Sequence, residues 1–343
     1  MVEAGFYECE EAGRLRCRLC AHSCSLGEGQ VGLCGVREAR EGVLYSLSYG
    51  RLAAAAVDPI EKKPFFHVLP GSKSFSVATP GCNMSCRHCQ NAELSQGPRE
   101  GRGIRGRFAA PEQIVEAAGS RGCRSIAYTY SEPTVFYEYA RDIAGLAREK
   151  GLLNLFVTNG YISAEALRAS VPWLNGANVD LKAFSDEFYR DVCGARLEPV
   201  LETIALMKEL GIWVEVTTLL IPGYNDAPTE LGRLAEFLAG LDPLIPWHVT
   251  AFRPTHKLLA PPPTSVEILL RARRIGRAAG LAYVYAGNVP GNEGECTDCP
   301  ACGERLITRR GFAVEKIALR QGTCPSCAAA VPGIFADEVA DSC

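Results

Sequence analysis

The sequence contains no long hydrophobic run. No segment approaches the roughly 18 consecutive apolar residues that a membrane-spanning helix requires, so we expect no membrane association. The first residues, MVEAGFYECEEAGRLRC, carry acids where a secretory signal peptide has a basic segment followed by an apolar one. We therefore expect a cytoplasmic protein.

The sequence also lacks a strong excess of charge of either sign. The formal net charge is -3, from 36 Lys and Arg against 39 Asp and Glu, so no polyelectrolyte surface is indicated and a nucleic acid partner is not expected. With 343 residues, 47% of them hydrophobic, the chain is long enough for one large domain with small appendages. These numbers are those of an ordinary globular protein.

Cysteine, in contrast, is abundant. A cytoplasmic compartment would keep the sixteen cysteines reduced, which favours metal or redox chemistry over disulfides. Their distribution predicts three parts: a cysteine-rich N-terminal extension over 1–70, a body over 71–293, and a C-terminal module over 294–343. We expect the extension to bind a metal.

The body alternates short apolar runs with helical patterns. Strands are predicted at 74–80, 124–130, 154–159, 177–184, 213–222, 247–252 and 282–287, and helices at 111–122, 132–151, 199–211 and 227–242. Such alternation predicts a parallel α/β sheet with right-handed crossovers. Six or seven units are fewer than the eight of a closed barrel, so we expect an open, partial barrel with its active site at the carboxyl ends of the strands.

The motif PGCNMSCRHCQN (80–91) follows the first of these strands and holds Cys82, Cys86 and Cys89. Buried free thiols, or a zinc site completed by His88 or a distant residue, are two interpretations of it. Thiolates also hold iron–sulfur clusters, and three cysteines for four irons would leave one iron with an open position. We favour the cluster, because the loop is bracketed by Gly81 and polar residues.

This spacing resembles the signature of radical S-adenosylmethionine (SAM) enzymes. The resemblance implies a [4Fe-4S] cluster bound by Cys82, Cys86 and Cys89, with SAM as the missing ligand of the fourth iron. It further implies reductive cleavage of SAM to a 5'-deoxyadenosyl radical, which abstracts hydrogen from a substrate, and a partial (β/α)6-type barrel. The cofactor supplies this chemistry, and the protein supplies position and electron access.

The resemblance also implies SAM contacts. Glu132 in YTYSEP stands where the family has a glycine-glycine-glutamate element, although Tyr130 and Ser131 replace the two glycines. Further matches are Thr158 and Asn159 in TNG, Asp180 and Lys182 in DLK, and Asn288 in GNVPG. Asp180 and Lys182 are equally compatible with a structural pair, and Asn288 with a turn residue.

The order of DPIEKKPFFHVLPGS, YTYSEPT, VDLKAF, IPGYND, WHVTAFRP and GNVPG is similar to that of the AmmeMemoRadiSam-type radical SAM enzymes, which are related to pyruvate formate-lyase activating enzymes. Arg253 departs from that pattern, where a histidine is expected. The resemblance implies AMMECR1-like and Memo-like proteins as partners and a reduced flavodoxin or ferredoxin as electron donor. The alternatives are activation of a glycyl radical enzyme and a zinc-stabilised scaffold without radical chemistry.

Two further cysteine sets have four members each. Cys299, Cys302, Cys324 and Cys327 have the spacing of a structural zinc ribbon, with a hairpin expected between the two pairs. Cys17, Cys20, Cys24 and Cys34 lie in a glycine-rich segment that a metal would organise. For this N-terminal set, spacing leaves zinc and a second iron–sulfur cluster open, with zinc slightly favoured.

One charged segment lies between the N-terminal cysteines and the first barrel strand. It contains Asp58, Glu61, Lys62, Lys63 and His67. We expect a surface loop with paired charges, and the alternative is a cover over the mouth of the barrel.

Overall fold

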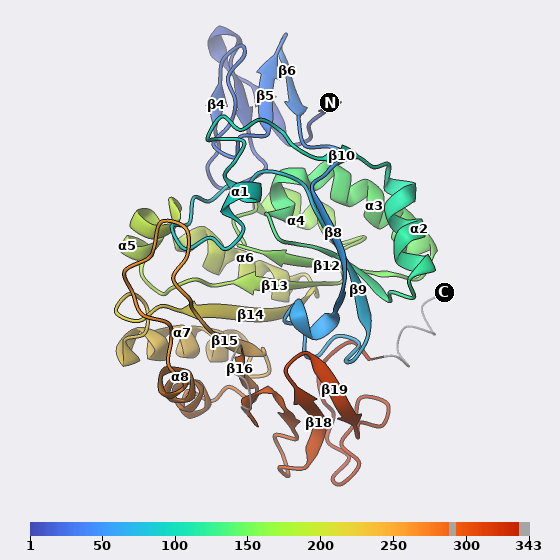
Figure 1. The fold of residues 1–343 in the computed structure, drawn as a ribbon, viewed down its shortest axis with the longest axis vertical. Coiled ribbons are helices and arrows are strands. Elements are labelled where there is room, and N and C mark those ends of the chain that lie inside the picture. Colours follow the sequence, from blue (N-terminus) through green and yellow to red (C-terminus); the bar gives the residue numbers. More distant parts are fainter. Residues whose placement is uncertain (288–292, 336–343) are drawn as a thin grey trace.

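A single eight-stranded sheet forms the centre of the structure, a computed structural model that describes residues 1–287 and 293–335 (Figure 1). Seven of its strands run parallel, and they occur where the sequence predicted them. They are β9 (Lys73–Ala78), β11 (Ser125–Tyr128), β12 (Leu153–Thr158), β13 (Gly176–Asp180), β14 (Trp213–Leu220), β15 (Trp247–Ala251) and β16 (Val284–Gly287). Their order follows the chain, and β9 and β16 do not pair, so the predicted open barrel is confirmed.

Helices connect successive parallel strands. They are α1 (Ala92–Ser95) and α2 (Pro111–Ser120) before β11, then α3 (Tyr137–Glu149), α4 (Ala164–Ser170), α5 (Asp186–Phe188) with α6 (Glu198–Glu209), α7 (Pro228–Leu241) and α8 (Val266–Ala278). Helices α1, α4, α5 and α8 were not predicted from the sequence. The buried residues of α8 are Leu269, Ala272 and Gly276. A side chain at Gly276 would lie 2.8 Å from the Trp247 ring, which is why this position is glycine.

The eighth strand, β8 (Ala54–Pro59), pairs antiparallel with β9 at one edge of the sheet. The predicted N-terminal extension included these residues. The domain boundaries themselves stay a prediction, although the sheet takes in residues from before position 71.

The charged segment after β8 is not a surface loop. Ile60, Phe65 and Val68 are fully buried and pack against Leu153 and Leu155, at the amino end of β12. The main-chain N–H groups of Phe66 and His67 donate to the carboxylate of Glu215, near the amino end of β14. The segment therefore fills the amino end of the barrel interior rather than covering its mouth, and the expectation of a surface loop is wrong. Paired charges made this possible, because Asp58 neutralises Lys63 at 2.8 Å.

The N-terminal part consists of short antiparallel strands at one end of the long axis (Figure 1). These are β1 (Val2–Glu3), β2 (Tyr7–Cys9), β3 (Leu15–Cys17), β4 (Ser25–Leu26), β5 (Arg37–Arg40) and β6 (Val43–Ser46), while β7 (Arg51–Leu52) pairs with β10 (Arg107–Phe108). A buried ion pair between Arg37 and Glu138 of α3 fastens this part to the barrel. The main-chain N–H of Ser163 also donates to Leu19 O at 2.9 Å.

The C-terminal part lies at the opposite end (Figure 1). It is a sheet of β17 (Thr297–Asp298), β18 (Arg305–Arg310) and β19 (Ala313–Ile317), in which β18 and β19 form the predicted hairpin. None of the helices that the structure describes is long and apolar enough to cross a membrane.

Candidate active site

One cavity of about 490 Å³ occupies the barrel interior. Alternate residues of the strands line it, as expected for the inward face of a sheet: Asp180 on β13, Thr217 and Leu219 on β14, and His248 and Thr250 on β15. Phe66 and its neighbours from the buried segment line it at the amino end, and the loop after β9 lines it at the carboxyl end. The cavity is therefore a chamber between these two segments.

Cys82, Cys86 and Cys89 all line this chamber. The main-chain N–H of Met84 donates to Cys82 Sγ at 3.3 Å, and the side-chain amide of Asn159 donates to the same sulfur at 3.6 Å. The hydroxyl of Ser95 lies 3.1 Å from Cys89 Sγ. Donors aimed at sulfur favour the thiolate that binds metal, whereas burial raises the pKa of Cys82 and of Cys89.

Glu132 lies at the carboxyl end of the next strand and is fully buried. Its Oε1 accepts from the hydroxyls of Thr134 and Thr158, both at 2.7 Å, and its Oε2 accepts from the main-chain N–H of Asn159 at 2.8 Å. Burial raises the pKa of Glu132 despite these bonds. The predicted residues Glu132, Thr158 and Asn159 thus form one hydrogen-bonded group that lines the chamber beside Cys82.

Asp180 ends β13, Lys182 follows it by two residues, and both line the chamber. Lys182 Nζ lies 3.1 Å from Asp180 Oδ2, so the two form the ion pair that the sequence analysis left open. The main-chain N–H of Lys182 donates to the hydroxyl of Tyr189 at 3.0 Å. Eight of the nine residues predicted for the cluster and SAM therefore converge; the ninth, Asn288, lies outside the described residues.

A polar group at the amino end of the chamber, which we call its floor, was not predicted from the sequence. Glu215 of β14 is fully buried and accepts from the main-chain N–H of His67 at 2.9 Å and from His248 Nε2 at 2.7 Å. Burial alone would raise the pKa of Glu215, but these bonds outweigh it and the pKa lies below its usual value. An acid within the apolar strand WVEVTTLL was the available signal.

His67 and Tyr285 extend this group. His67 Nδ1 lies 2.7 Å from the carbonyl of Pro332 and must carry the proton, so Nε2 accepts from the hydroxyl of Tyr285 at 2.7 Å. Burial lowers the pKa of His67 to about 4, so the ring is neutral at pH 7. The floor of the chamber is therefore fixed by bonds between the barrel, the buried segment and the C-terminal part.

Cys193 also lies near the loop that holds Cys82, Cys86 and Cys89. The ligand atoms of Cys86, His88 and Cys193 lie within 4.8 Å of one another, and all three residues are buried. A hydrogen bond from Cys193 lowers the pKa of Cys86. Sequence spacing could not find Cys193, because a helical turn more than a hundred residues downstream brings it there.

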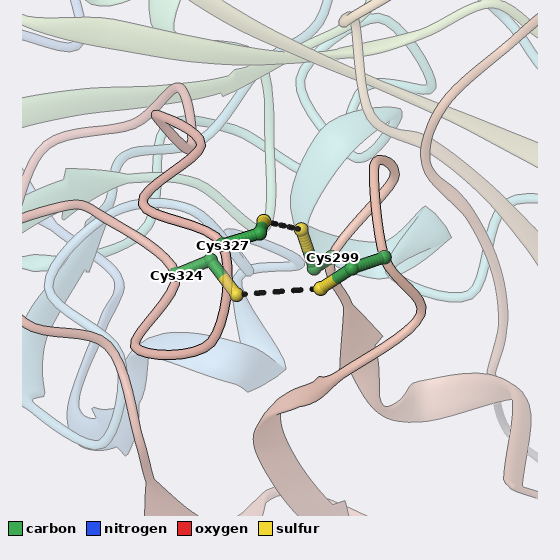
Figure 2. Close-up of side chains that lie close together, drawn as sticks. Cys299, Cys324 and Cys327 are labelled. Carbon is green, nitrogen blue, oxygen red and sulfur yellow. Dashed lines mark hydrogen bonds between the residues drawn. The ribbon is translucent and has the colours of Figure 1, made fainter.

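The predicted ribbon cysteines gather at one point of the C-terminal part. All four sulfur atoms of Cys299, Cys302, Cys324 and Cys327 lie within 4.8 Å of one another. Figure 2 shows the sulfur atoms directed toward one another, with separations of 3.6 Å in two of the pairs. A tetrahedral zinc ion with Zn–S bonds of about 2.3 Å requires sulfur separations of about 3.8 Å, so this arrangement fits one metal ion.

Comparison with known proteins decides the family. Residues 76–237 match the radical SAM superfamily, and this stretch contains the three-cysteine loop. The chain belongs to the radical SAM superfamily. An uncharacterized protein of Methanocaldococcus jannaschii is 48% identical over 313 residues, which are 91% of this chain and 92% of the relative. Membership implies that this radical SAM enzyme uses a [4Fe-4S] cluster and SAM, and the thiols converging on one chamber fit that pair.

More distant relatives share parts of this radical SAM enzyme. The isethionate sulfite-lyase activating enzyme of Nitratidesulfovibrio vulgaris is 29% identical over 136 residues, which are 38% of this chain and 44% of the relative. The crystal structure of a radical SAM methyltransferase from Sphaerobacter thermophilus superposes with a TM-score of 0.50 at 18% identity, covering 64% of this chain and 68% of the other. At that identity the second likeness concerns the fold alone.

Proposed function

We propose that this enzyme binds a [4Fe-4S] cluster through Cys82, Cys86 and Cys89. It abstracts hydrogen from a substrate held toward the amino end of the same chamber. When bound, the cluster and SAM supply the 5'-deoxyadenosyl radical by reductive cleavage. The observation that carries the proposal is the continuity of one cavity from the three thiols to the floor at Phe66, His248 and Tyr285.

Different residues of the chamber are assigned to SAM and to the substrate. Glu132 is linked to Cys82 through Asn159, and we assign it, with Thr158 and Asn159, to the amino and carboxylate end of SAM. Asp180 and Lys182 are assigned to its ribose, and Asn288 to its adenine, as the family resemblance implies. This leaves Thr217, His248 and Thr250 toward the substrate.

The test is the formation of 5'-deoxyadenosine by anaerobically reconstituted protein under a strong reductant. Cys86→Ala should abolish the product. Cys123→Ala is the matched control, because Cys123 is equally buried but lies outside the chamber lining, and it should keep the activity. Full activity of the Cys86 variant would refute the assignment. Protein that binds only zinc and forms no product would favour the scaffold alternative.

Activation of a glycyl radical enzyme is the second candidate. The similarity to an isethionate sulfite-lyase activating enzyme favours it, over less than half of that relative's length. In this case the substrate would be a glycine-containing loop of a partner protein. A glycyl radical enzyme encoded nearby would favour activation, whereas AMMECR1-like or Memo-like neighbours would favour the first candidate.

Several further assignments belong to the same proposal. We infer zinc at the C-terminal cysteines, because their sulfur separations suit a single tetrahedral ion. AMMECR1-like and Memo-like proteins are proposed partners, and reduced flavodoxin or ferredoxin is the proposed electron donor. A cytoplasmic location goes with these assignments, because thiolate ligands require a reducing compartment.

A further inference from the structure

The two four-cysteine sets of this chain differ in how far apart their sulfur atoms lie. Among the described residues, the groups of three or more potential ligand atoms within 4.8 Å of one another are the C-terminal set and the group around Cys86. Cys17, Cys20, Cys24 and Cys34 form no such group. Instead, these four residues surround a small cavity of about 20 Å³.

The separation between the sulfur ligands depends on the kind of metal centre that they bind. A single ion draws all of its sulfur ligands to one centre, which sets their separation at about 3.8 Å for zinc. A cuboidal cluster gives each sulfur its own iron at a different corner, so its ligands stand farther apart around a core. Cys82, Cys86 and Cys89, which belong to the superfamily's cluster signature, likewise do not share one compact group, although Cys86 lies in such a group with His88 and Cys193. The N-terminal set thus resembles the cluster loop of the same chain, not its ribbon.

A buried arginine lies beside the N-terminal cysteines. The guanidinium of Arg37 is buried and donates to Cys17 Sγ at 3.6 Å, while Glu138 binds its other side. Glu138 balances the charge of Arg37, and the guanidinium offers one further N–H to the Cys17 sulfur. The small cavity is otherwise walled by apolar side chains such as Leu19 and Val135 and offers a water few partners.

The segment that holds the N-terminal cysteines also contacts the loop that holds Cys82, Cys86 and Cys89. His22, which lines the small cavity, donates from Nε2 to the carbonyl of Asn83 at 2.6 Å. The carbonyl of Cys34 packs so closely on Gly81 that a side chain there would come within 3.2 Å of it. Gly81 has a φ of 109°, so the position requires glycine on two grounds. Main chain adjoining one cysteine set is therefore in contact with main chain adjoining the other.

We propose that Cys17, Cys20, Cys24 and Cys34 bind a second [4Fe-4S] cluster. Each of its irons has a cysteine ligand, and the cluster would carry one electron beside the loop that holds the other three cysteines. This replaces the slight preference for zinc that sequence spacing alone supported. The proposal concerns metal identity and stands whatever the substrate is.

The test counts metals in protein expressed with both iron and zinc available and purified without oxygen. The wild type should contain about eight irons, eight sulfides and one zinc, from two clusters and one ribbon ion. Cys20→Ala/Cys34→Ala should lose about half of the iron and sulfide and keep its zinc. About four irons and two zincs in the wild type would overturn the proposal.

A second variant covers the case in which the N-terminal variant does not fold. Cys82→Ala/Cys86→Ala/Cys89→Ala leaves the N-terminal set intact and should retain about four irons, with the electron paramagnetic resonance signal of a reduced cluster. Absence of iron from this variant, with zinc in its place, would refute the second cluster even if the wild type cleaves SAM. In the reduced wild type, two adjacent clusters should show magnetic interaction that either variant lacks.

Discussion

The buried ion pair between Arg309 and Glu61 provides a sharp test of how the C-terminal part supports the chamber. Arg309 lies on β18, and its Nε is 3.4 Å from Glu61 Oε1, with both side chains fully buried. The same guanidinium donates to the carbonyl of Phe66 at 2.7 Å and to the hydroxyl of Thr297 at 2.8 Å. Arg309→Met removes the charge and these donors while keeping an apolar stem of similar length.

The expected cost follows from burial. Removing one partner of a buried pair destabilises a protein by about 3–5 kcal/mol, since the other charge stays buried without compensation. Burial already raises the pKa of Glu61, and the charge of Arg309 opposes that shift. Without Arg309, the pKa of Glu61 in the folded state rises further above its unfolded value, so the folded state binds more protons. The deficit should therefore shrink as the pH falls and grow as it rises.

Urea denaturation of metal-replete protein at pH 5.5 and pH 8 measures this. Arg309→Met/Glu61→Gln should recover at least half of the loss at pH 8, because Gln still accepts from the main-chain N–H of Gly71, which lies 3.0 Å from Glu61 Oε1. Arg310→Met is the matched control on the exposed side of the same strand and should change the free energy of unfolding by less than about 0.5 kcal/mol. A double variant no more stable than Arg309→Met would refute the charge argument.

Three further predictions concern other parts of the molecule. Because burial lowers the pKa of His67 to about 4 from about 6.5 when unfolded, about 3 kcal/mol of stability should be lost as the pH falls through that interval, and urea titrations of His67→Gln should lack this slope. Gly276→Ala should destabilise by about 1–3 kcal/mol against Trp247, whereas Gly232→Ala in α7, with open space around it, should stabilise slightly; equal thermal midpoints would contradict this. Cys302→Ser should release the ribbon metal, measured with a chromogenic chelator, and leave the iron content unchanged, whereas loss of iron with it would show that the metal sites depend on one another.

Local patterns were sufficient for most of the fold. The seven parallel strands could be predicted because each is a short, nearly continuous apolar run between turn residues, as strands buried on both faces are. Helix α8 was not predicted, although its buried residues Leu269, Ala272 and Gly276 recur at helical spacing, and the need for glycine at 276 depends on the Trp247 ring of a neighbouring strand. A pattern of hydrophobicity does not register a glycine that is selected by a close approach.

Some residues of the candidate site could likewise be identified from the sequence, and others could not. Cys82, Cys86 and Cys89 are close in sequence, so a loop of fixed length brings them together whatever surrounds it, and motif spacing identifies them. Glu215 and Cys193 contribute through contacts with residues far away in the chain, and no short motif encodes such contacts. The segment around His67 was misplaced for the same reason, because its charges find their partners only in the folded structure.

The sequence alone therefore determined the chemistry, through the count and spacing of its cysteines and the periodicity of its strands. Tertiary structure decided where that chemistry is enclosed. It placed an unexpected segment at the floor of the barrel and the C-terminal part against that segment. It also separated the sulfur atoms of one four-cysteine set while gathering those of the other. Ligand type is a property of residues, whereas the distance between ligands is a property of the packed chain, and that distance distinguishes one ion from a cluster.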